Sequence, residues 1–269
     1  MTRISANNNR RKASNLYCGR SFSEAWIATT ALSARLLVAS AGLGLIDALS
    51  EIPSYSATIS SGSSDCVINK LRTGHAIDWW IALNRKSPYA VPLDTANYDL
   101  VMIAMSIPYF GLIREQLAEL PSSERLKLRL FLRLGKAELP GDLSDYLMPY
   151  DARLDQAKGP NPGTLSDFSQ RALRHFAEKI FPQALNGDAE LHQKIVKESL
   201  IGLTPPSRAP GRRVSNDDIL HLIEQYWSEE TTSPSKMLRV FRDEIGVACE
   251  QKRFHSLFIQ IAASKTPHG

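Results

Sequence analysis

Asp151, Arg153 and Asp155 lie close together in residues 146–164, a segment rich in proline and glycine. A carboxylate beside a guanidinium stays ionised, so it can orient water or stabilise a cationic sugar. This is the chemistry needed to hydrolyse an N-glycosidic bond, and it makes Asp151 a catalytic candidate. The other interpretation is an Arg–Asp ion pair that only ties the loop down.

A predicted helix start follows this segment and is suited to binding an anion. Thr164 and Asp167 form a capping-box pattern before a helical pattern at residues 165–181. Free backbone N–H groups at Gly163 and Thr164 would then face a phosphate. We assign phosphate or sugar binding to Thr164 and to two arginines, Arg20 and Arg153.

A second candidate carboxylate, Asp47, follows an apolar run at residues 35–46 that predicts one buried strand. Gly42 and Gly44 superficially suggest a dinucleotide loop, but the third glycine of that motif is missing. Ligands of open α/β sheets bind beyond the carboxyl ends of the strands, which places Asp47 at the crevice. The alternative is that Asp47 only caps a turn. Base stacking is assigned to nearby aromatic residues, Tyr55 or Tyr109.

Strand and helix patterns alternate through the region that would position these residues. Strands are expected at residues 15–19, 35–46, 99–106 and 125–136, and helices at residues 21–34, 65–85, 109–120 and 165–181. This alternation is typical of an α/β domain with a mostly parallel sheet. We place that domain at residues 15–203, after a disordered basic tail at residues 1–14.

The segment at residues 125–136 alternates leucine with basic residues. A period of two predicts a strand with one apolar face and one basic face. We expect the basic face to bind DNA phosphates through Arg125, Lys127 and Arg129.

A linker at residues 204–213 precedes three short helical patterns at residues 214–269. Three short helices in such a length fit a helix-turn-helix-like module. DNA binding by this module would depend on one shared basic face, formed by Arg239, Arg242, Lys252 and Arg253. The alternative is a bundle that docks a protein or is purely structural.

Composition and motifs exclude several classes of protein. The net charge of +4 permits a nucleic-acid partner without requiring one. No apolar run reaches the roughly 20 residues needed to cross a bilayer, and no secretory signal is visible, so we expect a cytoplasmic protein. Zinc-ligand spacings, a Walker loop and a Gly-x-Ser-x-Gly elbow are all missing from the sequence, and we expect no metal or cofactor.

Several motifs of the N-terminal region occur together in one family. They are G-R-S-F at residues 19–22, S-A-G-L-G-L-I at 40–46, I-P-S-Y at 52–55, DLVMIAMSIPYFGLI at 99–113 and PYDARL at 149–154. This region resembles small α/β domains that accompany deazaguanine-inserting and phage-defence enzymes, and the resemblance implies a three-layer, uracil-glycosylase-like fold. Residues 233–254 resemble short helical DNA-binding modules of restriction and defence proteins.

The functional analogue that the resemblance suggests is an antiphage DNA glycosylase acting on glucosylated hydroxymethylcytosine. Our leading hypothesis is therefore an enzyme that flips a hypermodified cytosine out of double-stranded phage DNA and excises it. The Gly-x-Asp-Pro-Tyr motif with which uracil glycosylases activate water is not in the sequence. The alternative is a non-catalytic sensor of a nucleotide or modified base, or a DNA-binding regulator. The oligomeric state is left open.

Overall fold

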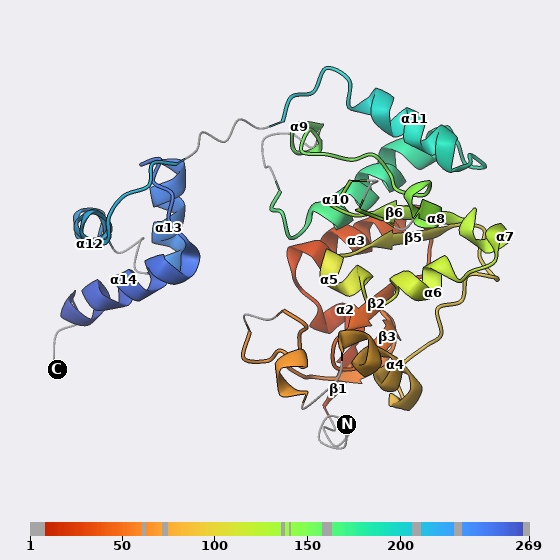
Figure 1. The fold of residues 1–269 in the computed structure, drawn as a ribbon, viewed down its shortest axis with the longest axis horizontal. Helices are drawn as coiled ribbons and strands as arrows, with labels where there is room; N and C mark the ends of the chain where they lie inside the picture. Colours follow the sequence, from red (N-terminus) through yellow and green to blue (C-terminus); the bar gives the residue numbers. More distant parts are fainter. Residues whose placement is uncertain are drawn as a thin grey trace. The chain divides into compact units, whose positions relative to one another are not determined.

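A computed structural model describes residues 9–60, 63–71, 75–135, 138–139, 141–157, 163–205, 211–228 and 233–265. The chain divides into two compact units, Met1–Pro205 and Pro206–Gly269, which we call the first and the second unit (Figure 1). The division falls inside the linker predicted at residues 204–213. No helix in the described part of the chain is long and apolar enough to span a bilayer.

The first unit mixes helices with short strands, which confirms the predicted α/β class. Its strands are β1 Arg10–Lys12, β2 Leu37–Ser40, β3 Gly44–Asp47, β4 Glu51–Pro53, β5 Val101–Ala104 and β6 Leu128–Phe131. The α-helices are α2 Ala13–Leu16, α3 Arg20–Leu32, α4 Ala76–Lys86, α5 Ile107–Phe110, α6 Arg114–Ala118, α7 Ser122–Arg125, α8 Gly141–Ser144, α9 Leu154–Ala157, α10 Phe168–His175 and α11 Ala189–Ser199. A five-residue π-helix, η3 Phe176–Ile180, directly follows α10, and two three-residue 3-10 turns are η1 Ile68–Lys70 and η4 Phe181–Gln183.

The described strands pair two by two, so the predicted mostly parallel sheet is not observed. Strands β1 with β4 and β2 with β3 are antiparallel, whereas β5 and β6 are parallel. A parallel bridge between Leu130 and Leu147 adds a further segment beside β6. Helices α3 and α10 pack against each other on one face of β5 and β6 (Figure 1). The other face packs on α4 and α6, so hydrophobic cores lie on both faces.

The single strand predicted at residues 35–46 is a hairpin. Strand β3 runs back along β2, with Ser40 opposite Gly44 and Leu37 opposite Asp47. Gly44 has φ +89°, a backbone conformation that residues with a Cβ rarely adopt. A Cβ at this position would also lie 2.8 Å from the side-chain oxygen of Asn84. The glycine therefore lets the chain reverse where an apolar run alone suggests continuation.

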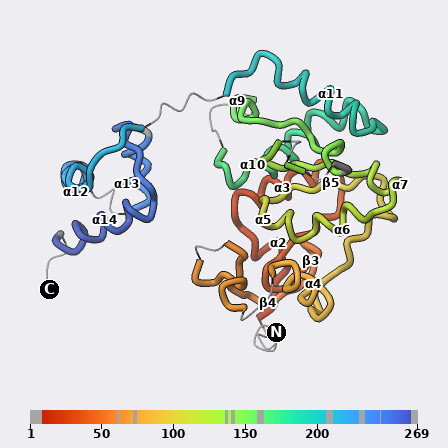
Figure 2. Tube along the Cα trace, in the orientation of Figure 1, coloured from red at the N-terminus to blue at the C-terminus, as the bar shows by residue number. Residues whose placement is uncertain are grey.

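The N-terminal end of the described chain is ordered differently from the prediction. Residues 15–19 were predicted to form a strand, but α2 ends at Leu16 and the strand lies earlier, at β1. Strand β1 falls inside the predicted disordered tail and pairs with β4. Figure 2 follows the path of the chain through the first unit and labels β4. Ala13 is buried in a small cluster with Leu43, Ile46 and Ile52, so this end is fixed by packing.

The basic-faced strand predicted at residues 125–136 is also wrong. Only β6 is a strand there, and all four of its residues are buried. Arg129 is 2% exposed and cannot reach a DNA phosphate, whereas Leu126 is 64% exposed. The two cations that flank Leu126 bind backbone carbonyls. Arg125 Nη1 donates to the Ala118 carbonyl at 2.8 Å, and Lys127 Nζ donates to the Ala96 carbonyl at 3.0 Å. The two-residue alternation of a strand holds only within β6, because α7 and a turn come directly before it.

Buried Arg129 ties β6 to the segment before α11. Its Nε donates to His192 Nδ1 at 2.9 Å, and its Nη2 donates to the Gly187 carbonyl at 2.8 Å. Its Nη1 donates to the carbonyls of Leu126 and Leu128. Burial lowers the pKa of Arg129 to about 10, so the guanidinium remains charged at neutral pH. We call Arg129, His192 and Gly187 the arginine clamp.

We expect the arginine clamp to weaken in acid. His192 Nε2 donates to Ala184 while Nδ1 accepts from Arg129, so the ring is neutral. Burial lowers the pKa of His192 below its usual value of about 6.5, and the Arg129 charge contributes. The stabilisation is thus complete above about pH 6.5 and is lost as pH falls through the lower, folded-state pKa.

The measurement is the free energy of unfolding in urea at pH 7.5 and at pH 5.5 for the wild type and for His192→Gln. The wild type should lose more than the variant between the two pH values, by up to about 1.4 kcal/mol for each pH unit below about 6.5. Equal losses in the two proteins would contradict the assignment.

The described residues of the second unit form a bundle of three helices, α12 Asn216–Gln225, α13 Pro234–Asp243 and α14 Gln251–Lys265. The three helical patterns predicted in this part of the chain are helices. Ser215 and Asp218 form a capping box, and Ser233 caps α13 with Pro234 in its first turn. The buried side chains of the three helices form one apolar core around Phe241 and Phe254.

Candidate functional site

A cluster of hydroxyl groups lies at the carboxyl end of β2. Ser40 Oγ accepts from the N–H groups of Gly42 and Leu43, at 3.3 and 3.0 Å. The Tyr55 hydroxyl lies 2.5 Å from Ser40 Oγ and also hydrogen-bonds to the Tyr17 hydroxyl. A Cβ on Gly42 would come within 2.7 Å of the Tyr55 ring. Gly42 is therefore needed for packing against Tyr55, not for a phosphate loop.

Further aromatic side chains extend from one side of this hydroxyl cluster, which is defined as Tyr17, Ser40 and Tyr55. The ring of Phe22 lies 5.6 Å from the ring of Tyr17 and 6.0 Å from that of Trp26, which is 36% exposed. Burial raises the pKa of Tyr17, and Tyr55 adds to the rise. The Tyr17 hydroxyl is thus neutral at physiological pH and remains a hydrogen-bond donor.

Tyr109 connects the hydroxyl cluster to the carboxyl end of β5. It lies on α5, which begins three residues after β5 ends. Burial raises the pKa of the Tyr109 hydroxyl, which bonds to Thr58, and nearby Tyr55 contributes to the rise. We call the region around the ends of β2 and β5, at Ser40 and Ala104, the carboxyl edge.

An ionic network lies on the other side of the carboxyl edge. Arg171 is buried between two carboxylates: its Nε donates to Asp167 at 2.6 Å and its Nη1 to Asp155 at 2.5 Å. Arg20, at the first position of α3, places Nε 3.1 Å from the second oxygen of Asp167. A Cβ at position 163 would overlap the Arg171 guanidinium, so glycine is required there.

The network is fixed to the sheet by the first turn of α10. Ser169 Oγ donates to the Met105 carbonyl at 3.1 Å, and Gln170 Nε2 donates to the Ala104 carbonyl at 2.9 Å. Both acceptors lie at the end of β5. Arg20, which is half-exposed, therefore lies over the same edge as the hydroxyl cluster, because Tyr17 precedes it by only three residues.

The structure brings four of the predicted substrate-binding residues to the carboxyl edge. Tyr55 and Tyr109 belong to the aromatic side, and Arg20 and Thr164 both contact Asp167. The predicted roles change in two cases. The Thr164 N–H donates to Asp167 Oδ1 at 2.9 Å, so it is not free to bind an anion. The Tyr55 hydroxyl is bonded and its ring packs against Gly42, so this ring is not free for the predicted stacking.

Asp47 does not lie in the predicted crevice with Tyr55. The hairpin places Asp47 opposite Leu37, at the amino end of β2, whereas Tyr55 bonds to Ser40 at the carboxyl end. Three residues of strand separate the two ends by roughly 10 Å. Asp47 instead pairs with Arg35 at 2.7 Å and accepts from the Leu49 N–H. Asp47 therefore caps a turn, as the alternative interpretation of the sequence predicts.

Asp151 and Arg153 form an ion pair. Arg153 Nη2 lies 2.7 Å from Asp151 Oδ2, and Nε lies within 3.0 Å of both carboxylate oxygens. The Arg153 hydrogen bonds lower the pKa of Asp151, so its carboxylate is ionised at neutral pH. The Asp151 side chain is 50% exposed and follows the strand-like segment at Leu147, so it remains accessible at that segment's carboxyl end.

Sequence reasoning missed four residues of this region, Tyr17, Ser40, Asp167 and Arg171. A signal existed for the last two, since an Asp and an Arg four residues apart on a helix face each other. Ser40 directly before a glycine turn was a weaker signal. No residue spacing indicated Tyr17, because its hydrogen-bond partner lies 38 positions away.

The basic residues predicted for DNA binding in the second unit differ in availability. Arg239, Arg242 and Lys252 are exposed, and Arg242 lies 3.4 Å from the Cys249 carbonyl just before α14. Arg253 is occupied within the bundle: Nε donates to Asn216 at 2.8 Å and Nη2 to the Val214 carbonyl at 2.9 Å. Arg253 therefore holds α14 to the start of α12, and three cations remain for a DNA role.

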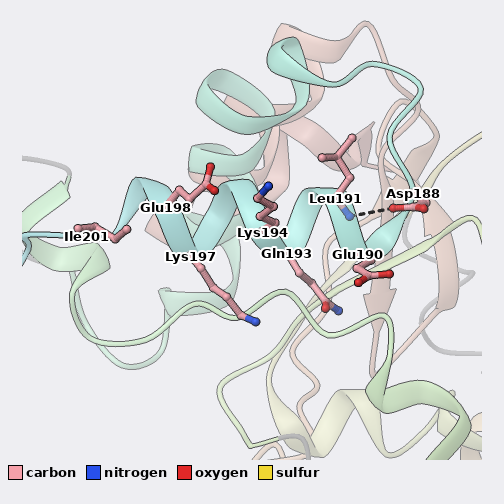
Figure 3. A pocket seen from close by; sticks show the side chains of 8 residues that line it. All are labelled: Asp188, Glu190, Leu191, Gln193, Lys194, Lys197, Glu198 and Ile201. Atoms are coloured by element: carbon pink, nitrogen blue, oxygen red, sulfur yellow. Dashed lines mark hydrogen bonds between the residues drawn. The ribbon is translucent and has the colours of Figure 1, made fainter.

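A hollow of about 740 Å³ runs along α11 and is separate from the carboxyl edge (Figure 3). Its lining comes from one helix and its flanks: Asp188, Glu190, Leu191, Gln193, Lys194, Lys197, Glu198 and Ile201. Across the described residues, no three metal-ligating side chains of the His, Cys, Asp or Glu type come together.

Comparison with known proteins returned no match: no family model, no curated protein and no solved structure matches this chain. The geometry of the carboxyl edge is therefore the basis of the functional argument.

Proposed function

We propose that the chain is a DNA glycosylase that excises a hypermodified cytosine from double-stranded phage DNA, with a three-layer, uracil-glycosylase-like first unit and a helix-turn-helix-like second unit. One observation carries the proposal. The carboxyl edge gathers partly exposed aromatic rings, hydroxyl groups and a half-exposed arginine beside one another. These groups match the three parts of a nucleotide: base, sugar and phosphate.

The base would have to leave the duplex before it reaches this edge, because a stacked base is inaccessible. Trp26 and Phe22 offer ring faces for stacking on the extruded base. Arg20 lies at the start of α3 and would bind the adjacent phosphate by exchanging its contact with Asp167. After this exchange the Asp167 carboxylate still has a cationic partner, because Arg171 remains bonded to it.

Asp151 is the carboxylate that fits the reaction. Because the pKa of Asp151 is lowered, the side chain is an anion and stabilises positive charge on the sugar or orients water, but does not donate a proton. The bond between sugar carbon C1′ and the base nitrogen breaks, and the base leaves with the electron pair. Water supplies hydroxide to C1′ and a proton to the base, leaving an abasic site.

The test uses the full chain and two duplexes of the same sequence, one with glucosylated hydroxymethylcytosine and one with cytosine. Abasic sites are detected by alkaline strand cleavage, and the released base is identified by mass spectrometry. We expect both products from the modified duplex only. Retention of every modified base, at protein concentrations that saturate the duplex, overturns the enzymatic proposal.

A non-catalytic sensor of modified bases is the second candidate function, and one observation favours it. Both carboxylates considered for catalysis, Asp47 and Asp151, lie in ion pairs. Tight binding of the modified duplex without release of the base, in the same experiment, would favour the sensor.

For the second unit, we expect DNA affinity to depend on the exposed cations among its predicted DNA-binding residues, Arg239, Arg242 and Lys252. The variant Arg239→Gln/Arg242→Gln/Lys252→Gln should bind duplex DNA more weakly at every sequence. The slope of log affinity against log salt should fall by about 2 to 3, since each phosphate contact contributes about 0.9. The matched control removes three exposed lysines of the first unit, Lys179, Lys194 and Lys197. Equal slopes in the two variants would show that these three cations do not bind the phosphates.

A further inference from the structure

Helix α14 of the second unit has one buried face and one exposed face. The buried face packs into the apolar core of the bundle and consists of Phe254, Leu257, Phe258 and Ile261. The opposite face is exposed along the described helix. No Asp or Glu occurs among the 15 residues of α14, so the exposed face carries no negative charge. A face of this kind is suited to an anionic partner.

The exposed residues of the other two helices differ from those of α14 in charge. Helix α12 exposes three acids, Asp217, Asp218 and Glu224. Helix α13 exposes three cations, Lys236, Arg239 and Arg242. Acids repel a phosphate backbone, whereas cations bind it without regard to sequence. These two helices therefore offer no uncharged hydrogen-bonding surface of the kind that α14 has.

Most of the exposed face of α14 consists of uncharged hydrogen-bonding groups, those of Gln251, His255, Ser256 and Gln260. In the described part of the chain, no protein group hydrogen-bonds to the side chains of Gln251, His255 or Gln260. Ser256 Oγ donates to the Lys252 carbonyl at 3.1 Å and can still accept a hydrogen bond. Ile259 lies among these groups and is 52% exposed.

The edges of base pairs in the major groove of DNA match this set of groups. A glutamine amide can bond bidentately to adenine, a serine hydroxyl can bond to several bases, and an apolar side chain can contact the methyl group of thymine. The groove is about 12 Å wide and admits an α-helix. Residues 251–260 extend over roughly 14 Å, the length of about four base pairs.

Cations at the start of α14 can hold the helix on the DNA backbone. Arg242 Nη2 lies 3.4 Å from the Cys249 carbonyl, just before the helix, and Lys252 is exposed in its first turn. The nearest acid, Glu250, precedes the helix by one residue, and residues two apart such as Glu250 and Lys252 do not share a helix face.

A protein partner is less favoured at this face than DNA. Ile259 is the one large apolar side chain that the described part of α14 exposes. The centres of protein interfaces are enriched in aromatic and apolar residues, and a single isoleucine among glutamines does not provide such a centre.

We propose that α14 is the recognition helix of the second unit, with its exposed face in the major groove of DNA. Gln251, His255 and Gln260 bond to base edges, and Ile259 contacts a thymine methyl group. Sequence preference then comes from α14, whereas sequence-independent affinity comes from the cations of α13. The inference rests on the DNA-binding part of the proposed function and does not depend on base excision.

The experiment selects duplexes from a random library of unmodified DNA with the full chain. Fluorescence anisotropy then measures the affinity for the selected duplex and for a scrambled one at several salt concentrations. We expect a motif of about four base pairs that includes A·T pairs. The selected duplex should bind at least about 10-fold more tightly than the scrambled one, because one bidentate contact to a base can give this discrimination.

The variant Gln251→Ala/His255→Ala/Gln260→Ala should lower this preference to less than about twofold, because the groups that bond to base edges are removed. Its slope of log affinity against log salt should equal that of the wild type, since the variant keeps every lysine and arginine. The matched control is Gln225→Ala, which removes an exposed glutamine at the end of α12 and should keep the full preference. Circular dichroism establishes that both variants are folded.

Selection of no motif overturns the recognition helix, and so does a motif that the folded triple variant still prefers. A dimer of the full chain that Ile259→Asp converts to monomers in sedimentation also overturns it, because a second copy would then cover the face.

These outcomes are separate from those for base excision. A motif without base release from modified DNA would leave α14 as the recognition helix and remove the enzyme. Base release without a motif would leave the glycosylase standing and remove the recognition helix alone.

Discussion

Replacing Arg171 by methionine is expected to lower the free energy of unfolding of the first unit by about 3–5 kcal/mol. Arg171 is buried between Asp155 and Asp167, and its Nη2 also donates to the Thr164 carbonyl. Methionine fills much of the volume but leaves two carboxylates largely uncompensated in a buried region. The measurement is urea unfolding followed by the fluorescence of Trp26, Trp79 and Trp80.

The matched control is Arg153→Met, which removes an arginine from the partly exposed pair with Asp151. A pair of this kind contributes about 0–1 kcal/mol, because solvent screens the charges and each side chain loses freedom. The two variants thus make the same chemical change at different burial. A smaller loss for Arg171→Met than for Arg153→Met would contradict our account of the ionic network.

Replacing Asp151 by asparagine is expected to lower the rate of base release about 100-fold, the typical loss when one charge-stabilising group is removed. Asparagine has nearly the same shape but no charge, so it cannot stabilise a cationic sugar. The measurement is the single-turnover rate of abasic-site formation in the modified duplex. The dissociation constant for the same duplex should change by less than about threefold, since Asp151 acts on the charge that develops during the reaction.

Asp47→Asn is the matched control for that experiment. It removes a carboxylate of the same type from an ion pair with Arg35, but at the opposite end of β2. We expect its rate to stay within about twofold of the wild type, since a group roughly 10 Å from the edge does not touch the reacting atoms. Equal losses in both variants would mean that Asp151 acts through the fold alone.

Much of the fold was predictable from local patterns because their causes are local. The helix at α3, the strand at β5 and the capped starts of α12 and α13 depend on residues near one another in the chain. The hairpin of β2 and β3 was not predictable in this way, because an apolar run has the same residue pattern whether it forms one strand or reverses into two. Only the backbone conformation of Gly44 distinguishes the two.

The candidate site was less predictable because long-range contacts assemble it. The sequence predicts Arg20 and Thr164 to share one site, but it indicates only a helix cap at Asp167, which contacts both. Arg129 shows the limit of periodicity most clearly. Its spacing placed it on a face of a strand, but the sequence did not indicate that α11 would cover that face.

The arginine clamp also determines which parts of the first unit can open separately. Arg129 and Gly187 are 58 positions apart, and their hydrogen bond crosses from β6 to the segment that leads into α11. Lifting that segment would leave a buried, charged guanidinium without two of its four acceptors, so detaching the segment on its own is costly. Strand β6 and the start of α11 should therefore exchange their amide hydrogens as one cooperative unit, although separate elements usually exchange at separate rates.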